Sequence, residues 1–280
     1  MHSQIRFGLE LPPLVDDASP VPRGGYPISV AEVARLAEDA GLDTLWLAEG
    51  GPGTMDPVPL AGSLAPGTTT LGVGITIRPS RGRHPSVVAR DVTTIDLLTD
   101  GRAAVALVED GATTLDVERL VEAVSVLHRL LTEEQVTASG SFYEVAELTT
   151  RPRPVRPEGP PIVVGIVGPT ERGDRFSESV MVGGWAEGYV IGGTPDDVAA
   201  GRVRLDSVAW HGERPMLLWR GSLGADHRAA AELAGSVLKS GADGLIAVLG
   251  PDSAVGAGLV AEVVGRVLEV MSPLTRLFES

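Results

Sequence analysis

The chain has 280 residues, of which 43% are hydrophobic, and a formal net charge of −14. That length can bury one core of barrel size, and the acidic balance argues against a nucleic-acid-binding protein, which needs a basic surface. No apolar run is long enough to cross a membrane, there is no cysteine for disulfides or thiol chemistry, and the N-terminus lacks a signal-peptide pattern, so we expect one cytoplasmic domain over residues 1–280.

The first half of the chain alternates between strand and helix patterns. Ile5–Leu11 alternates as a strand does, and a loop rich in proline, glycine and aspartate follows it. Ser29 and Glu32 form a capping-box pattern for a helix that ends at Gly41. The next predicted elements are a strand at Thr44–Ala48, a short helix at Pro57–Ala65, a strand at Leu71–Ile77, a loop at Arg78–Pro85, a helix at Ser86–Leu98 capped by Ser86, a strand at Ala103–Val108 and a helix at Leu115–Leu131.

The second half opens on an irregular excursion, Thr132–Pro161, whose proline-rich segment Arg151–Pro161 is predicted to be extended. Ile162–Val167 is wholly apolar, which indicates a strand buried on both faces. Thr194 is a predicted helix cap, with Pro195 at the first helical position. The remaining predicted elements are a helix at Glu171–Val182, strands at Tyr189–Ile191, Met216–Trp219 and Leu245–Leu249, a helix at Asp226–Lys239 and a closing helix at Ser253–Val270.

Strict alternation of eight strands with eight helices favours parallel strands joined by right-handed crossovers. Eight such units predict a closed (β/α)8 TIM barrel rather than an open, doubly wound sheet. The active site of a barrel lies where its strands end. The polar and glycine residues at or just beyond the ends of the predicted strands are Glu49, Thr76, Arg78, Glu109, Asp110, Gly168, Thr170, Gly192, Gly193, Thr194, Arg220, Ser222 and Asp252.

Several stretches of sequence resemble the luciferase-like monooxygenase superfamily, in particular its branch that uses the deazaflavin F420. The stretch "LAEDAGLDTLWLAEG" resembles that family's first helix and second strand, and "LGVGITIRPSRGRHPSVVARDVTTIDLLTDGR" resembles its third strand, loop and helix. Similar stretches are "FYEVAELTTRPRPVRPEGPPIVVG", "IGGTPDDVAAG" and "LAGSVLKSGADGLIAVL", so the resemblance covers essentially the whole chain. It implies a bacterial luciferase-like barrel that acts as an oxidoreductase or monooxygenase on a small organic substrate.

The resemblance also implies a cofactor, F420 or FMN, whose ring lies across the barrel mouth against Glu49, Thr76 and Ile77. The family often has a non-proline cis peptide after the third strand. Glu49 would frame the ring and Glu109 would hand a proton to the substrate, so these two are the expected catalytic residues. The resemblance further implies a homodimer, although the sequence marks no interface.

The cofactor's phosphate is expected at Gly168, Pro169 and Thr170, where the start of a helix suits an anion. Nearby the resemblance places the three arginines of the loop that follows the third strand: Arg78, which is expected to bind the cofactor, Arg81 and Arg83.

Two departures from the family pattern favour a second hypothesis, a degenerate barrel that has lost its cofactor and serves a binding or structural role. Gly50 stands where the family commonly has histidine or asparagine, and "VEDGATT" replaces a glycine-rich turn with a cofactor-reading asparagine. Glu109 and Asp110 in that turn put negative charge beside an anionic ligand. This is costly unless a cation compensates or the side chains turn away.

Other chemistries receive less support from the sequence. Glu49, Glu109 and Asp110 are spaced for a glycosidase-type pair, but aromatic residues, on which sugars stack, make up only 4% of the chain. His84 is a candidate base in its loop, while Lys239, the one lysine available for a Schiff base, sits in a helical surface pattern. The five histidines show no metal-ligand spacing.

Overall fold

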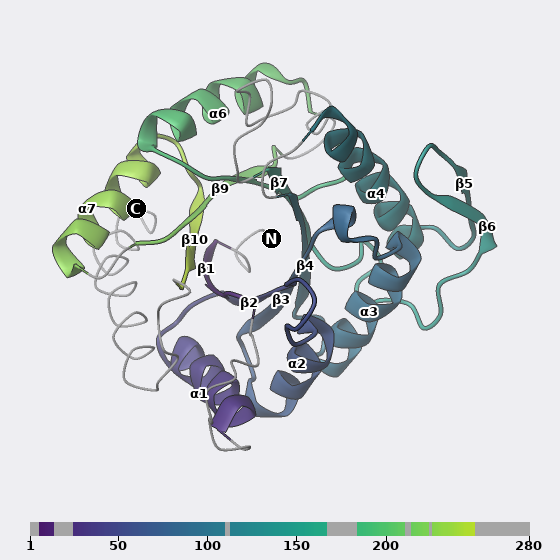
Figure 1. The fold of residues 1–280 in the computed structure, drawn as a ribbon, viewed down its shortest axis with the longest axis horizontal. Coiled ribbons are helices and arrows are strands. Elements are labelled where there is room, and N and C mark those ends of the chain that lie inside the picture. Colours follow the sequence, from purple (N-terminus) through teal and green to yellow (C-terminus); the bar gives the residue numbers. More distant parts are fainter. Residues whose placement is uncertain are drawn as a thin grey trace.

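The computed structural model describes residues 6–13, 25–109, 113–166, 184–210, 214–223 and 226–249. Eight parallel strands close into a barrel in the order β1-β10-β9-β8-β7-β4-β3-β2 (Figure 1). The predicted barrel is thereby confirmed, and the open sheet is excluded. The barrel strands are β1 (Phe7–Leu11), β2 (Thr44–Ala48), β3 (Gly72–Ile77), β4 (Ala103–Glu109), β7 (Ile162–Ile166), β8 (Gly188–Ile191), β9 (Met216–Gly221) and β10 (Gly244–Val248).

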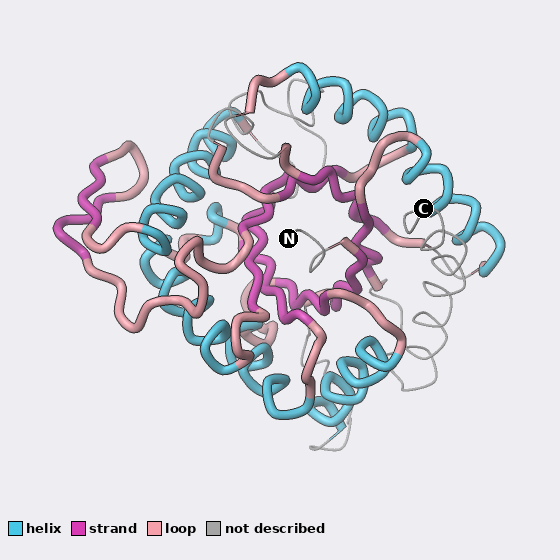
Figure 2. Tube along the Cα trace, turned by 180° about the vertical axis from the view of Figure 1, so that it is seen from behind, coloured by secondary structure: helices cyan, strands magenta, loops and turns pink. Residues whose placement is uncertain are grey.

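Helices surround the strands as an outer ring (Figure 2). Among the described helices none is long and apolar enough to span a membrane. The predicted helices at Glu171–Val182 and Ser253–Val270 lie outside the described residues. The described helices of the ring are α1 (Gly25–Asp39), α2 (Pro57–Leu64), α3 (Pro85–Leu98), α4 (Thr114–Thr132), α6 (Pro195–Ser207) and α7 (His227–Lys239).

Two predicted helix starts are wrong. The helix α1 begins at Gly25, ahead of the capping pair predicted from Ser29, and its first turn can hold a proline because the nitrogens of that turn have no partner within the helix. The cap of α3 is His84 rather than Ser86: the His84 Nδ1 atom accepts a hydrogen bond from the Ser86 backbone nitrogen at 3.1 Å. Pro85 then takes the first helical position, where a proline is favoured.

The irregular excursion contains a hairpin that the sequence did not predict. Strands β5 (Val136–Ser139) and β6 (Glu144–Leu148) pair antiparallel to each other. Figure 1 shows the pair outside the ring of helices, beside α4. Both strands are short and mostly exposed, so neither carries the apolar run that would reveal a barrel strand.

The barrel interior is filled around Trp46, which is fully buried. Two glycines on the neighbouring strands make room for its indole. A Cβ atom at Gly74 would lie 2.3 Å from the Trp46 Cε3 atom, and one at Gly8 would lie 2.8 Å from Nε1. The interior cluster comprises Trp46, Ala104, Ala106, Val108, Val163, Val190, Met216, Leu218 and Ile246.

Aspartates close the opposite end of the barrel, where the strands begin. Asp43 precedes β2 and accepts a hydrogen bond from the Phe7 backbone nitrogen of β1 at 2.9 Å. Asp243 precedes β10 and accepts one from the Leu217 backbone nitrogen of β9 at 2.8 Å. Each aspartate follows a glycine by two positions, so the same short turn ties together two pairs of neighbouring strands.

Burial raises the pKa of Asp43 from 3.8 to about 6. The folded chain therefore binds this proton more tightly than the unfolded chain does, and stability falls as pH rises from about 4 to about 6. Asp43→Asn keeps an acceptor for Phe7 and removes the buried charge. We expect the variant to be more stable than wild type by about 1–2 kcal/mol at pH 8 and equal to it near pH 3. Urea unfolding at both pH values measures this, and an equal gain at both would contradict it.

Candidate functional site

A polar cluster lies inside the barrel at the carboxyl ends of its strands; we call Glu10, Thr76 and Arg220 the mouth cluster. The Glu10 Oε2 atom accepts hydrogen bonds from the Thr76 hydroxyl at 3.2 Å and from Arg220 Nε at 2.9 Å. Its Oε1 atom accepts from Arg220 Nη2, so the arginine is held bidentately. Glu10 is only 1% exposed, and this pairing compensates its buried charge.

The mouth cluster stands directly above the indole of Trp46. Along a strand every second residue faces the interior, so Glu10 comes one interior position after Gly8 and Thr76 one after Gly74. Both glycines contact Trp46, which therefore forms the floor beneath the cluster. Sequence reasoning considered residues that follow strands and so missed Glu10. The sequence does contain a sign of Glu10's role: it is a carboxylate within an otherwise apolar strand. A buried carboxylate needs a partner, so such a residue is a candidate for a polar site.

Glu49, at the end of β2, holds the loop of residues 78–84, which we call the β3–α3 loop. Its Oε2 atom accepts a hydrogen bond from the Arg78 backbone nitrogen at 3.0 Å, and its Oε1 atom accepts from Arg83 Nε at 3.2 Å. Arg78 in turn donates through Nη1 to the Glu49 carbonyl oxygen. Glu49 thus lies beside Thr76 and Arg78 as expected, and its carboxylate is engaged with the loop.

Glu109, at the end of β4, holds the same loop from the other side. Its carboxylate oxygens accept hydrogen bonds from the Ser80 backbone nitrogen at 2.7 Å and the Ser80 hydroxyl at 2.6 Å. Glu109 is 3% exposed and follows Leu107 on the outer face of β4, opposite the interior residue Val108. Burial raises the pKa of the Glu109 carboxyl, while the hydrogen bonds from Ser80 act against that rise. This placement favours a positioning role over the expected transfer of a proton to substrate.

Arg83 is enclosed by three carboxylates. Its guanidinium forms ion pairs with Glu49 at 3.2 Å, Asp56 at 2.8 Å and Asp91 at 3.0 Å. Burial acts to lower the pKa of Arg83, but Asp56 and Glu49 outweigh it, and the pKa is raised. The guanidinium of Arg83 is therefore engaged in ion pairs that hold its own loop. The resemblance had placed this side chain near the cofactor's phosphate.

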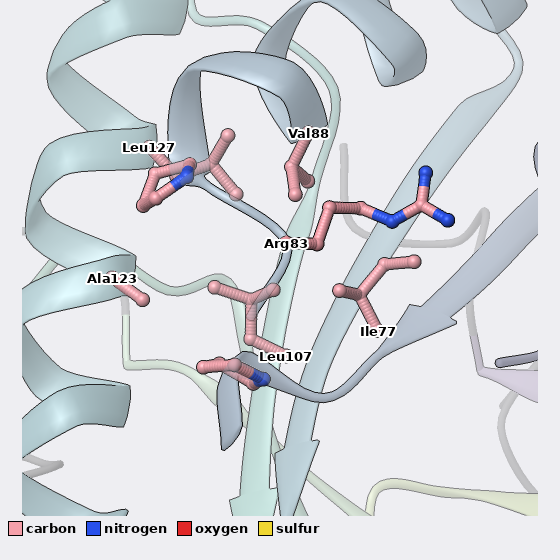
Figure 3. A pocket seen from close by; sticks show the side chains of 8 residues that line it. Ile77, Arg83, Val88, Leu107, Ala123 and Leu127 are labelled. Atoms are coloured by element: carbon pink, nitrogen blue, oxygen red, sulfur yellow. The ribbon is translucent and has the colours of Figure 1, made fainter. Parts of the chain in front are cut away.

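A small apolar pocket lies beneath the β3–α3 loop, on the outer side of the barrel. Figure 3 shows the stem of Arg83 along it and the guanidinium pointing away. Its room, about 10 Å³, is that of roughly one water molecule, so it is no ligand site. The pocket is lined by Ile77, Pro79, Arg83, Pro85, Val88, Leu107, Ala123 and Leu127.

The expected cofactor residues fall into three groups. Thr76 and Arg78 lie at the mouth end of β3, whereas the side chain of Ile77 lines the outer pocket, which leaves only its backbone near the mouth. Gly168, Pro169 and Thr170 lie outside the described residues. The peptide bonds that follow β3 are trans, since among the described residues the cis bond is Arg151–Pro152.

Gly50 leaves no room for the side chain that the family commonly has there. A Cβ atom on Gly50 would lie 2.4 Å from Thr54 Cγ2 and 2.5 Å from Pro13 Cβ. His84, the candidate base, acts as a helix cap. Its Nδ1 atom contacts the Ser86 hydroxyl at 2.7 Å as well as the backbone nitrogen of that residue.

Schiff-base chemistry and metal binding find no support in the part of the chain that the structure describes. Lys239 is an exposed residue at the end of α7, as expected of a surface lysine. Within the described ranges no group of three histidine, aspartate or glutamate side chains is placed to hold a metal ion.

Eight parallel strands with polar side chains gathered at their carboxyl ends define a (β/α)8 barrel with its site at the mouth. The chain belongs to the luciferase-like monooxygenase family, whose model matches residues 13–207. The resemblance found in the sequence is thereby confirmed.

One relative is the F420-dependent glucose-6-phosphate dehydrogenase of Microbacterium testaceum, which is 27% identical over 185 residues, 59% of this chain and 52% of that protein. The chain thus spans about half the length of such curated relatives. Among solved structures, the monooxygenase RslO1 from Streptomyces bottropensis superposes with a TM-score of 0.79 at 16% identity, covering 96% of this chain and 99% of its own. The coenzyme F420-dependent tetrahydromethanopterin reductase from Methanopyrus kandleri superposes with a TM-score of 0.73 at 14% sequence identity. The match covers 95% of this chain and 99% of the reductase chain. These two likenesses concern the fold.

Proposed function

We propose that this protein is an oxidoreductase that uses F420 or FMN to act on a small organic substrate bound at the barrel mouth. The observation that carries the proposal is the mouth cluster, a fixed polar group above an apolar floor in a barrel of this family. Thr76, Arg78 and Arg220 would hold the ring, and Gly168 and Thr170 would bind the phosphate. When bound, the cofactor supplies the hydride or oxygen chemistry, while the protein supplies orientation and electrostatics.

The charges of the described residues fit an anionic cofactor. Glu109 turns its carboxylate to the outer face of β4, so it does not place negative charge in the mouth. Glu49 is likewise engaged by Arg78 and Arg83. Glu10, which does face the interior, is neutralised by Arg220. The electrostatic cost that the sequence suggested for Glu109 is thus avoided because the side chain turns away.

The chain's own residues then have distinct tasks. The Thr76 hydroxyl donates its proton to Glu10, which orients its oxygen to accept a hydrogen bond from a ligand N–H group. Glu10 fixes the guanidinium of Arg220 in one plane at the mouth. Trp46, fully buried in the barrel interior, forms the floor beneath them. Glu49 and Glu109 position the loop that carries Arg78.

A titration tests the proposal. Purified protein is mixed with F420 and, separately, with FMN while the quenching of cofactor fluorescence is followed. We expect saturable, stoichiometric binding of one of them. Thr76→Val removes one hydrogen-bonding group at nearly constant volume and is expected to weaken that binding about tenfold. Glucose 6-phosphate, the substrate named for the F420-dependent relatives, is the first substrate to assay.

The degenerate barrel is the second candidate, and the filled space at Gly50 favours it. It predicts that neither cofactor binds at saturable levels. That outcome would end the oxidoreductase proposal, whereas a cofactor copurifying at one per chain would exclude the degenerate barrel.

A further inference from the structure

The tip of the unpredicted hairpin, residues 140–143, is fastened to α4. Glu122 of α4 accepts hydrogen bonds from the backbone nitrogens of Ser141 at 3.0 Å and Tyr143 at 2.7 Å. A Cβ atom on Gly140 would lie 2.0 Å from the Glu122 Oε1 atom, so an alanine there would displace this carboxylate from the hairpin tip. The Arg119 guanidinium also covers the Phe142 ring, 4.9 Å from its centre. The hairpin tip is thus a fixed element.

From this tip Tyr143 reaches the end of the β3–α3 loop. Tyr143 is 7% exposed, and its ring meets the His84 ring edge-on, with centroids 5.4 Å apart and planes at 85°. His84 is both the last residue of the loop and the cap of α3. Burial raises the pKa of Tyr143 to about 12, and the charges of Glu122 and of Glu109, which holds Ser80 of the same loop, act in the same direction.

The Tyr143 hydroxyl is buried and has no hydrogen-bond partner among the described residues. A buried hydroxyl without a partner lowers stability, so the position of Tyr143 is set by the packing of its ring. Within that packing, the ring of Tyr143 makes an aromatic contact with the ring of His84.

We propose that Tyr143 is a positioning residue for the β3–α3 loop: through its edge-on contact with His84 it couples the outer hairpin to the loop that carries Arg78 at the barrel mouth. The loop is then held at four points: at Arg78 by Glu49, at Ser80 by Glu109, at Arg83 by its three carboxylates and at His84 by Tyr143. A loop ordered in advance loses less conformational freedom when a ligand binds. This consequence for affinity rests on the proposed function; the ordering of the loop does not.

Hydrogen–deuterium exchange of the full chain tests the ordering. Tyr143→Leu removes the ring, and we expect the amides of Ser80–His84 to exchange about threefold to tenfold faster. Tyr143→Phe keeps the ring and is expected to leave these amides unchanged. The matched control is Val145→Ala, on the same hairpin and equally buried, which lowers overall stability without touching the ring contact. Equal acceleration in Val145→Ala, or none in Tyr143→Leu, would overturn the proposal.

The partner ring gives a second, independent variant. His84→Asn removes the imidazole and supplies a good helix cap, so α3 keeps its start. We expect His84→Asn to reproduce the acceleration seen with Tyr143→Leu, and the double variant to exchange no faster than either single one. Additive effects would show that the two residues act separately and would refute the coupling.

Cofactor affinity is the last readout. With the cofactor that binds wild type, Tyr143→Leu is expected to raise the Kd by the same factor as the exchange rate, while Tyr143→Phe and Val145→Ala keep the wild-type Kd. If wild type binds neither F420 nor FMN, the proposed function fails, and the exchange measurements still decide the role of Tyr143.

Discussion

Gly74→Ala is expected to destabilise the protein by about 3 kcal/mol or more, because the new methyl group overlaps a rigid, fully buried indole. Its Cβ atom would lie 2.3 Å from Trp46 Cε3 and 2.5 Å from Cδ2. Trp46 is fully buried, so the indole has little room to move away. Urea unfolding of the purified variant measures the loss, and its soluble yield on expression reports the same effect.

A second substitution distinguishes this overlap from a general intolerance of alanine. Trp46→Leu by itself leaves a cavity and is expected to cost about 3 kcal/mol. When Trp46→Leu is combined with Gly74→Ala, it frees the space that the new methyl group needs. The double variant should therefore lose clearly less stability than the sum of the losses in the two single variants. Gly62→Ala is the control, since its Cβ would lie 3.7 Å from Leu98 Cδ1 in ordinary contact, and alanine suits a helix better. A loss of stability in that control would undermine the explanation.

Arg83→Met is expected to cost about 2–3 kcal/mol and to loosen the β3–α3 loop. The substitution keeps much of the apolar stem and leaves three carboxylates near one another without their cation. Arg83→Lys restores the charge but cannot bridge three partners, so we expect it to recover only part of the loss. Urea unfolding gives the stability, and proteolysis within residues 78–84 reports the loop.

Arg228→Met is the matched control for this loss. Arg228 pairs with Glu232 along α7 at 2.9 Å, and their side chains are 89% and 67% exposed. Such a surface pair contributes about 0.5 kcal/mol or less. If both variants lost the same stability, the three-carboxylate enclosure would have no special role, and Arg83 would be one more surface arginine.

The two carboxylates at the strand ends act on the loop between them. Glu49 and Glu109 were expected to act on the ligand directly. In the structure both carboxylates accept hydrogen bonds from residues 78–84. Glu49 does so from the end of β2 and Glu109 from the end of β4, the strands on either side of β3. Glu10, Thr76 and Arg220 are joined to one another in the interior at the mouth.

Much of the fold follows from local sequence signals. The position of β3 and the capping of α6 by Thr194 could be read in advance, because apolar runs and capping patterns act over a few residues. The hairpin could not, since its strands bury little. Its fixed shape depends on Glu122, a residue of a different element.

The sequence by itself determined the alternation of strands and helices, the closure of the barrel and the membership of the family. Only the tertiary structure decided which polar side chains face the mouth. The physical reason is that parallel barrel strands are buried on both faces, so they carry no alternation of polar and apolar residues to mark the inside. Glu10 faces inward and Glu109 outward, yet both stand in strands whose every residue is buried. Which way each one points depends on the register of the whole barrel.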